Sequence, residues 1–179
     1  KTIFYTKKDP LTLRSEKIYR HVLGTPTSED VEVFHEKDET FGTYVTKSKS
    51  KKYIIIGSYS TTSTEAQFLD ADNPTGDFKI LQPREKDLEY NVAHYGDAFY
   101  ILTNKDKATN FKLMKTAIDK TTKDNWVDVI PHRKETLLED FSIFKNYLVL
   151  EERNEGLSKI RIKSWDDKTD YYLPFNEET

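Results

Sequence analysis

Short runs of alternating apolar and polar residues fill almost the whole chain. Tyr, Ile, Val, Phe and Thr concentrate in these runs, polar turns separate them, and no long window carries the apolar stripe of an amphipathic helix. The pattern is therefore typical of an all-β protein. It predicts strands near residues 2–6, 17–23, 30–35, 42–47, 52–58, 64–69, 78–82, 89–94, 97–103, 111–117, 126–130, 138–143, 146–152, 159–164 and 170–175.

The strands repeat in groups of four. Three strands with a similar apolar quartet, "KKYIIIGSY", "DAFYILTN" and "KNYLVLEER", begin at Lys51, Asp97 and Lys145, and each is followed by two further strands that also resemble one another. A period of about 40–50 residues with four strands per unit is typical of β-propeller blades. A β-sandwich with regular hairpins is the alternative, but its similarity would recur every two strands.

The repeat predicts one partial propeller domain over residues 1–179. Three successive four-stranded antiparallel blades are expected at about 42–82, 89–131 and 138–175, and residues 1–36 are expected to be the remainder of a further blade. The chain would thus hold about three and a half blades, fewer than a closed ring requires. It also begins without Met, so we interpret it as a piece of a longer polypeptide.

One sequence motif occurs twice, as "DFKILQPREKDLEY" and "NWVDVIPHRKETLLED". In each copy a strand ends at a proline, Pro83 or Pro131, and at a strand end the missing N–H of proline costs the sheet no hydrogen bond. An arginine, Arg84 or Arg133, follows shortly after each proline. These positions correspond to the crossing from one blade to the next. We expect both arginines to form salt bridges between neighbouring blades, and the alternative is contact with substrate or with a partner domain.

Composition narrows the classes of partner. The chain has 179 residues, 33% charged residues, a formal net charge of -3 and no cysteine. Such a charge balance attracts neither nucleic acid nor an anionic membrane, and the lack of cysteine excludes disulfides. The longest apolar runs are far shorter than a membrane helix, and no targeting segment opens the chain. We therefore expect a soluble, cytoplasmic protein.

No pattern of catalytic, metal or cofactor residues stands out. No serine lies in the Gly-x-Ser-x-Gly motif of an α/β-hydrolase nucleophile, and no phosphate-binding glycine motif occurs. The four histidines are scattered along the chain. "DADNPTGD" (70–77) resembles the start of a calcium loop but lacks the later ligands, so a polar connection is favoured. "HEKDET" (35–40) is interpreted as a solvated loop between blades. We expect no metal site, no cofactor and no catalytic residue in this chain.

Four blocks resemble the propeller domain of the prolyl oligopeptidase family of serine peptidases, and within it the oligopeptidase B (protease II) branch. They are "KIYRHVLGTPTSEDVEVFHEKDETF", "YSTTSTEAQFLDA", "LTNKDKATNFKL" and "YLVLEERNEGLSKI", which together span most of the chain in order. The resemblance implies a seven-bladed propeller beside a catalytic α/β-hydrolase domain of the same polypeptide, which carries the Ser, Asp and His. None of those three residues maps onto this chain.

The same resemblance implies a role in substrate selection. The propeller of this family covers the active site and admits short peptides, and the oligopeptidase B branch cleaves after Lys and Arg without a cofactor. Phe4, in "KTIFYT", matches a propeller aromatic that lies near the active site in the prolyl enzymes. This chain alone is then expected to be inactive, and the parent protein is expected to be a serine-type endopeptidase.

Acidic residues near the first strands of the blades offer a source of specificity. Glu89, Glu139 and Asp140 lie where the chain is expected to run nearest the propeller axis, so they would attract short basic peptides. An open propeller would also expose blade flanks, so the fragment is expected to self-associate. The competing interpretation is a freestanding propeller scaffold that binds a protein or a glycan, because fold alone does not fix function.

Overall fold

The computed structural model describes residues 1–175, and within them the predicted strands are all present. Their ends differ from the predicted ends by a few residues. Short 3-10 helices occur only in connections, at Thr27–Glu29, Lys105–Lys107 and Lys123–Asn125. The strands are β1 (Thr2–Lys8), β2 (Ser15–Val22), β3 (Val31–His35), β4 (Gly42–Lys47), β5 (Tyr53–Tyr59), β6 (Thr64–Asp70), β7 (Lys79–Gln82), β8 (Tyr90–Tyr95), β9 (Ala98–Thr103), β10 (Lys112–Ala117), β11 (Val127–Ile130), β12 (Thr136–Ile143), β13 (Tyr147–Asn154), β14 (Leu157–Ser164) and β15 (Asp170–Tyr172).

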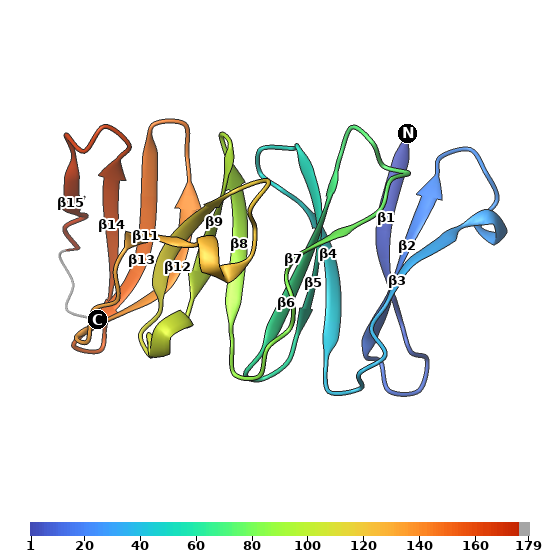
Figure 1. Ribbon diagram of the computed structural model, residues 1–179, viewed down its shortest axis with the longest axis horizontal. Helices are drawn as coiled ribbons and strands as arrows, with labels where there is room; N and C mark the ends of the chain where they lie inside the picture. Colours follow the sequence, from blue (N-terminus) through green and yellow to red (C-terminus); the bar gives the residue numbers. More distant parts are fainter. Residues whose placement is uncertain (176–179) are drawn as a thin grey trace. The chain divides into compact units, whose positions relative to one another are not determined.

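The strands form four antiparallel sheets, each a meander of consecutive strands. One sheet has three strands, β1-β2-β3, and the other three have four strands each, β4-β5-β6-β7, β8-β9-β10-β11 and β12-β13-β14-β15 (Figure 1). This arrangement confirms the predicted fold class, a partial propeller of antiparallel blades, because each sheet is a separate meander of three or four strands. The contacts divide the chain into two compact units, unit 1 up to Glu89 and unit 2 from Tyr90 onward.

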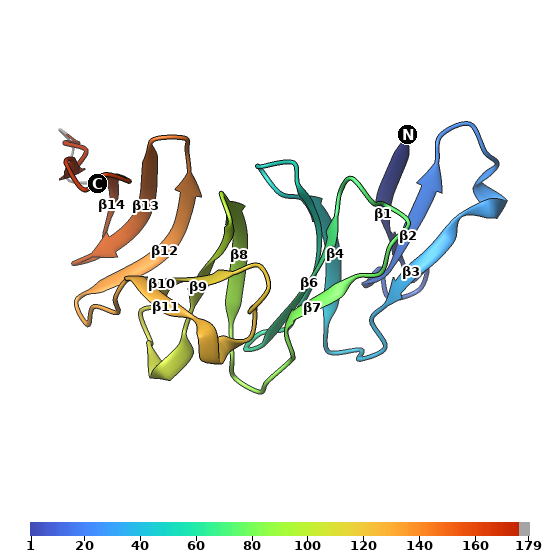
Figure 2. The ribbon, with the colours of Figure 1, turned by 45° about the horizontal axis from the view of Figure 1, so that its top comes forward.

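In unit 1 the core lies between the sheet β1–β3 and the sheet β4–β7. Strand β4 packs against β1 and β2 (Figure 2). Large apolar side chains fill this interior, and their burial drives the association of the two sheets. The most buried large apolar residues of unit 1 are Ile18, Ile55, Ile56, Leu69 and Leu81, of which Ile55 and Ile56 are neighbours on β5 and so point to opposite faces of that sheet.

Because Gly57 has no side chain, the ring of Tyr44 can lie directly over its backbone. The two residues pair directly across β4 and β5, and a Cβ at Gly57 would lie 2.3 Å from a Tyr44 ring carbon. The ring thus covers the glycine backbone, a contact that no larger residue permits.

We therefore expect Gly57→Ala to lower the free energy of unfolding by about 1–3 kcal/mol, the usual cost of overpacking. The added methyl group would displace Tyr44, so Tyr44→Ser in the same chain is expected to restore part of the loss. Urea denaturation of the two single variants and the double variant measures this coupling. Equal losses from Gly57→Ala with and without the Tyr44 ring would contradict the contact.

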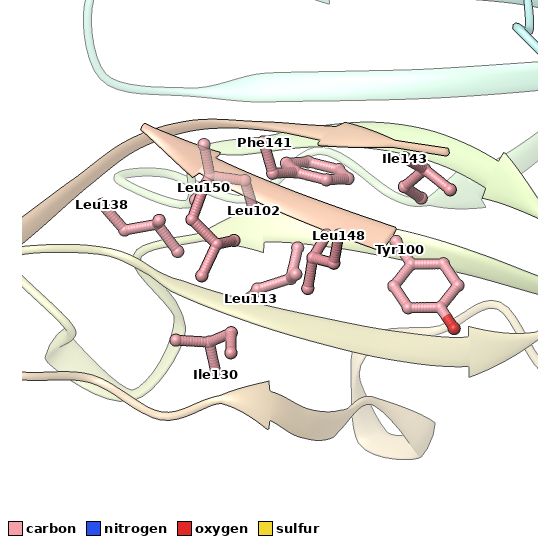
Figure 3. Packing of buried hydrophobic residues seen from close by; sticks show 9 residues of the cluster. All are labelled: Tyr100, Leu102, Leu113, Ile130, Leu138, Phe141, Ile143, Leu148 and Leu150. Carbon is pink, nitrogen blue, oxygen red and sulfur yellow. The ribbon is translucent and has the colours of Figure 1, made fainter. Parts of the chain in front are cut away.

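In unit 2 a single apolar cluster joins the sheet β8–β11 to the sheet β12–β15. Figure 3 shows side chains of both sheets interleaving in this cluster. Leu148 and Leu150, two positions apart on β13, point into it from one side. Its nine buried members are Tyr100, Leu102, Leu113, Ile130, Leu138, Phe141, Ile143, Leu148 and Leu150.

Candidate functional site

Connections of unit 1 are tied together at one end of its strands, which we call crossing rim 1. Arg14 Nη1 donates to the backbone oxygens of Glu36 at 3.2 Å and Phe41 at 3.0 Å, which joins the β1–β2 turn to the β3–β4 crossing. The Asp87 N–H donates to Ser63 Oγ at 3.0 Å, which joins the next turn to the next crossing. Figure 1 shows these connections at the same end of the strands. Crossing rim 1 comprises residues 9–14, 36–41, 60–63 and 83–88.

Arg84 and Glu36 form the buried centre of crossing rim 1. Glu36 is 4% exposed, and its Oε2 lies 2.5 Å from Arg84 Nη2. The Arg84 guanidinium also lies 3.7 Å above the Phe41 ring, a cation–π contact, and Asp38 lies 3.7 Å from it. The expected salt bridge at Arg84 is present. The interpretation of 35–40 as a solvated loop is wrong for Glu36, because Arg84 holds its carboxylate in the interior.

The pKa of Glu36 reflects this environment. Burial alone would raise the pKa, but hydrogen bonds from Arg84, Ser58 and the Asp38 N–H, together with the Arg84 charge, hold it below the ordinary value of 4.5. A lowered folded-state pKa stabilises the fold above the unfolded value, and that stabilisation is lost as the pH falls through the folded value.

We expect acid to destabilise unit 1 partly through Glu36. As the pH falls from 6 through the ordinary value of 4.5 and below it, the free energy of unfolding should decrease less steeply in Glu36→Gln than in the unchanged chain. Glu36→Gln should also be less stable at neutral pH, because Arg84 loses its charged partner. Urea denaturation at several pH values measures both effects. Parallel pH profiles for the two proteins would exclude Glu36 as a source.

Unit 2 has a corresponding set of joined connections, crossing rim 2, at residues 104–110, 131–135 and 154–156. Asn110 Nδ2 donates to the backbone oxygens of Arg133 at 3.2 Å and Lys134 at 2.6 Å. Asn154 Nδ2 donates to the backbone oxygen of Glu135 at 2.6 Å. Amide side chains therefore fix the β11–β12 crossing against the hairpin turns on both sides of it in the sequence.

Arg133 belongs to a buried ionic network around Glu152. Glu152 is 1% exposed, and its Oε1 lies 2.5 Å from Arg133 Nη2 and 3.8 Å from Arg161 Nη1. The Tyr172 hydroxyl donates to Glu152 Oε2 at 2.8 Å, and Arg161 binds Asp170 through two contacts of 2.7 Å. The salt bridge expected for Arg133 is therefore present, and Glu152, which sequence reasoning did not select, is its partner.

The two arginines of the repeated motif differ in where their partners lie: one partner comes earlier in the sequence and the other comes later. Arg84 binds Glu36, which precedes its own sheet, whereas Arg133 binds Glu152, which lies in the sheet that follows. Burial lowers the pKa of each guanidinium, but the carboxylate partners outweigh it, so the pKa of both stays raised. Each arginine thus remains charged and engaged in holding connections together.

The three acidic candidates have different surroundings. Glu89, next to β8, is half-buried, and exposed Glu139 is paired with Arg153 at 2.7 Å. Asp140 is exposed and accepts a hydrogen bond from the Phe141 N–H at 2.8 Å, and residues 1–175 offer it no ion pair. Strand β12 carries a bulge at this point, which turns both Glu139 and Asp140 outward. Asp140 therefore has the charge most available to a ligand.

Phe4 lies apart from the arginines. Its ring is half-buried on β1 and packs edge-on against Phe78 at 5.9 Å. It lines an open pocket with the end of β4 and residues 71–74, away from crossing rim 1. The structure thus does not bring Phe4 together with Arg84, and its contact with an active site stays a prediction.

Two further kinds of feature would bear on function in the described part of the chain, a cluster of metal-binding side chains and a membrane-spanning helix. Within residues 1–175, no group of three or more His, Asp or Glu side chains is placed to hold a metal ion. Among the same residues, no helix has the length and apolar character needed to cross a membrane.

Sequence comparison places the whole chain in one family. Residues 1–176 match the family described as "Prolyl oligopeptidase, N-terminal beta-propeller domain". Dipeptidyl aminopeptidase BI of Pseudoxanthomonas mexicana is 40% identical over 171 residues, which cover 96% of this chain and 24% of that protein. Protease 2 of Moraxella lacunata is 32% identical over 173 residues, covering 92% of this chain and 24% of that protein.

Solved structures agree with the sequence matches. Oligopeptidase B from Trypanosoma brucei, in a closed form with covalently bound antipain, superposes with a TM-score of 0.90 at 31% identity, over 99% of this chain and 26% of that one. Oligopeptidase B from Leishmania major gives a TM-score of 0.89 at 29% identity, with the same coverage. The chain thus spans about a quarter of the length of its relatives. It belongs to the prolyl oligopeptidase family, as part of its N-terminal β-propeller domain.

Proposed function

We propose that this chain is the substrate-filtering propeller part of a cytoplasmic serine oligopeptidase that hydrolyses short peptides after Lys or Arg. The catalytic Ser, Asp and His would lie in an α/β-hydrolase domain outside these residues. The observation that carries the proposal is the match of residues 1–176 to the propeller of a peptidase family, over only a quarter of the relatives' length. The 179-residue chain by itself would then be inactive.

The physical basis of filtering is a rigid scaffold. Apolar clusters and buried ion pairs join neighbouring sheets within each unit, so the sheets resist opening to admit a large substrate. A domain of this kind over an active site excludes folded proteins and water but lets an extended peptide through. Selection by size would follow from this geometry.

The proposed preference for basic peptides rests on charge and on two relatives. Asp140 offers an exposed carboxylate, and the relatives include a protease 2 and oligopeptidase B. A carboxylate on the entry path raises the local concentration of cationic peptides, and salt screens this effect.

In the complete protein, Asp140→Asn should therefore reduce the salt dependence of kcat/KM for a Lys or Arg peptide. Glu139→Gln, whose charge Arg153 already neutralises, should change it less.

A second activity is favoured by one relative. The protein from Pseudoxanthomonas mexicana, 40% identical, is named a dipeptidyl aminopeptidase. An enzyme of that kind removes two residues from a free amino terminus, whereas an endopeptidase accepts a blocked one. Both activities fit a propeller that restricts access, so the substrate's amino terminus distinguishes them.

The test compares the complete reading frame with the 179-residue chain on fluorogenic peptides. Each peptide ends in Arg or in Pro before the reporter group, and each is made with a free and with a blocked amino terminus. We expect cleavage after Arg of the blocked peptide, by the complete protein only. Cleavage after Pro, or only of the free dipeptide, would keep the family but change the specificity. No cleavage by either protein would favour a binding scaffold.

A further inference from the structure

The turn between β1 and β2 displays two leucines to solvent in a rigid frame. Leu11 is 91% exposed and Leu13 is 67% exposed. Asp9 Oδ1 accepts hydrogen bonds from the N–H groups of Leu11 at 2.9 Å and Thr12 at 2.7 Å, and the Asp9 N–H donates to the Arg14 oxygen at 2.9 Å. The turn is therefore preorganised, and it would lose little conformational entropy on contact with a partner.

Leu13 also holds a backbone conformation that does not suit it. Its φ is 60°, in the left-handed region where glycine or asparagine is the usual residue. Phe111 shares such a φ, 56°, but its ring packs against the core of unit 2. Leu13 has no comparable contact within the described residues. A bulky apolar side chain that is strained and exposed indicates a contact outside this chain.

The position of the turn indicates what kind of partner covers it. Neighbouring sheets pack on the faces of β1 and β2, as β4 does, whereas this turn lies beyond the strand ends, in crossing rim 1 (Figure 1). Arg14 anchors it there through the backbone oxygens of Glu36 and Phe41. A partner that covers this end is a separate domain and not a further blade. About three quarters of the relatives' length lies outside this chain.

We propose that Leu11 and Leu13 anchor crossing rim 1 to the catalytic domain of the same polypeptide. The inference rests on the proposed function only for the existence of that domain. The complementary surface would be apolar at its centre, with carboxylates at its border, because exposed Lys7 and Lys8 flank the turn. Burial of each leucine would favour the docked state roughly tenfold or more.

The experiment is site-specific photocrosslinking in the complete protein. Benzoylphenylalanine replaces Leu11, and in a control protein it replaces Ile80, an apolar residue on β7 that is also exposed. After irradiation, mass spectrometry identifies the crosslinked peptides. We expect the probe at position 11 to crosslink within one polypeptide to residues outside the propeller, and the probe at position 80 to give several times less. Crosslinks between two copies, or none from position 11, would overturn the proposal.

A second variant separates docking from folding. Leu13→Gly removes the side chain but suits the positive φ, so the complete protein should keep its thermal stability. Its crosslinking from position 11 should nevertheless fall several-fold, and an unchanged yield would contradict the anchor. Peptide hydrolysis is measured on the same samples. Crosslinking to another domain without hydrolysis would reject the proposed function alone, and hydrolysis without crosslinking would reject the docking alone.

Discussion

Replacing Glu152 by glutamine is expected to lower the free energy of unfolding of unit 2 by about 2–4 kcal/mol. The change leaves the guanidiniums of Arg133 and Arg161 beside a neutral amide in a site where the side chain is 1% exposed. Loss of one partner from a fully buried ion pair usually costs about 3–5 kcal/mol. The lower range applies because 30% of the Arg133 side chain and 21% of the Arg161 side chain stay accessible to water.

Glu151 provides a matched control for this prediction. It adjoins Glu152 on β13 but points to the opposite face and is exposed. Glu151→Gln should therefore change stability by less than about 0.5 kcal/mol, as surface substitutions usually do. Urea denaturation followed by tryptophan fluorescence measures both variants. Similar small effects at both positions would show that the network around Glu152 does not stabilise the fold.

Leu150→Ala should have an effect of similar size for a different reason. Leu150 is fully buried in the cluster between the sheets β8–β11 and β12–β15. Removal of its side chain loses apolar burial and leaves a cavity, which typically costs about 2–5 kcal/mol. Because the same cluster joins the two sheets, the variant should also loosen their packing and broaden the unfolding transition.

Leu157 on β14 is the control for Leu150. It is an exposed leucine on the neighbouring strand, so Leu157→Ala removes the same atoms without opening a cavity. Its cost should stay below about 1 kcal/mol. Calorimetry of the two variants gives both the stability and the width of the transition. Equal costs at positions 150 and 157 would contradict the assignment of the cluster as the joint between the sheets.

The sheets could be predicted from the sequence because side-chain direction in a strand alternates with a period of two. On β13, for example, Leu148, Leu150 and Glu152 all point inward, as alternate positions must. Strand ends were less predictable. The last strand was expected to reach residue 175 but ends at Tyr172, shortly before Pro174, whose nitrogen has no hydrogen to donate.

The buried ionic residues could be predicted only in part. The repeated motif indicated Arg84 and Arg133, and both form the expected salt bridges. Their partners Glu36 and Glu152 lie 48 and 19 residues away in the sequence, so the repeated motif did not identify either of them. One signal did exist for Glu152, because an acidic residue at an inward position of a strand requires a buried cation.

We propose that this chain selects substrates while another part of the polypeptide performs the chemistry. A fluorophosphonate reagent, which reacts with an activated serine, tests this claim on the complete protein and on the 179-residue chain. Labelling of the complete protein at one serine outside these residues, with no labelling of the chain, is the predicted result. Labelling of a serine within the 179 residues, or of none in either protein, would contradict the claim.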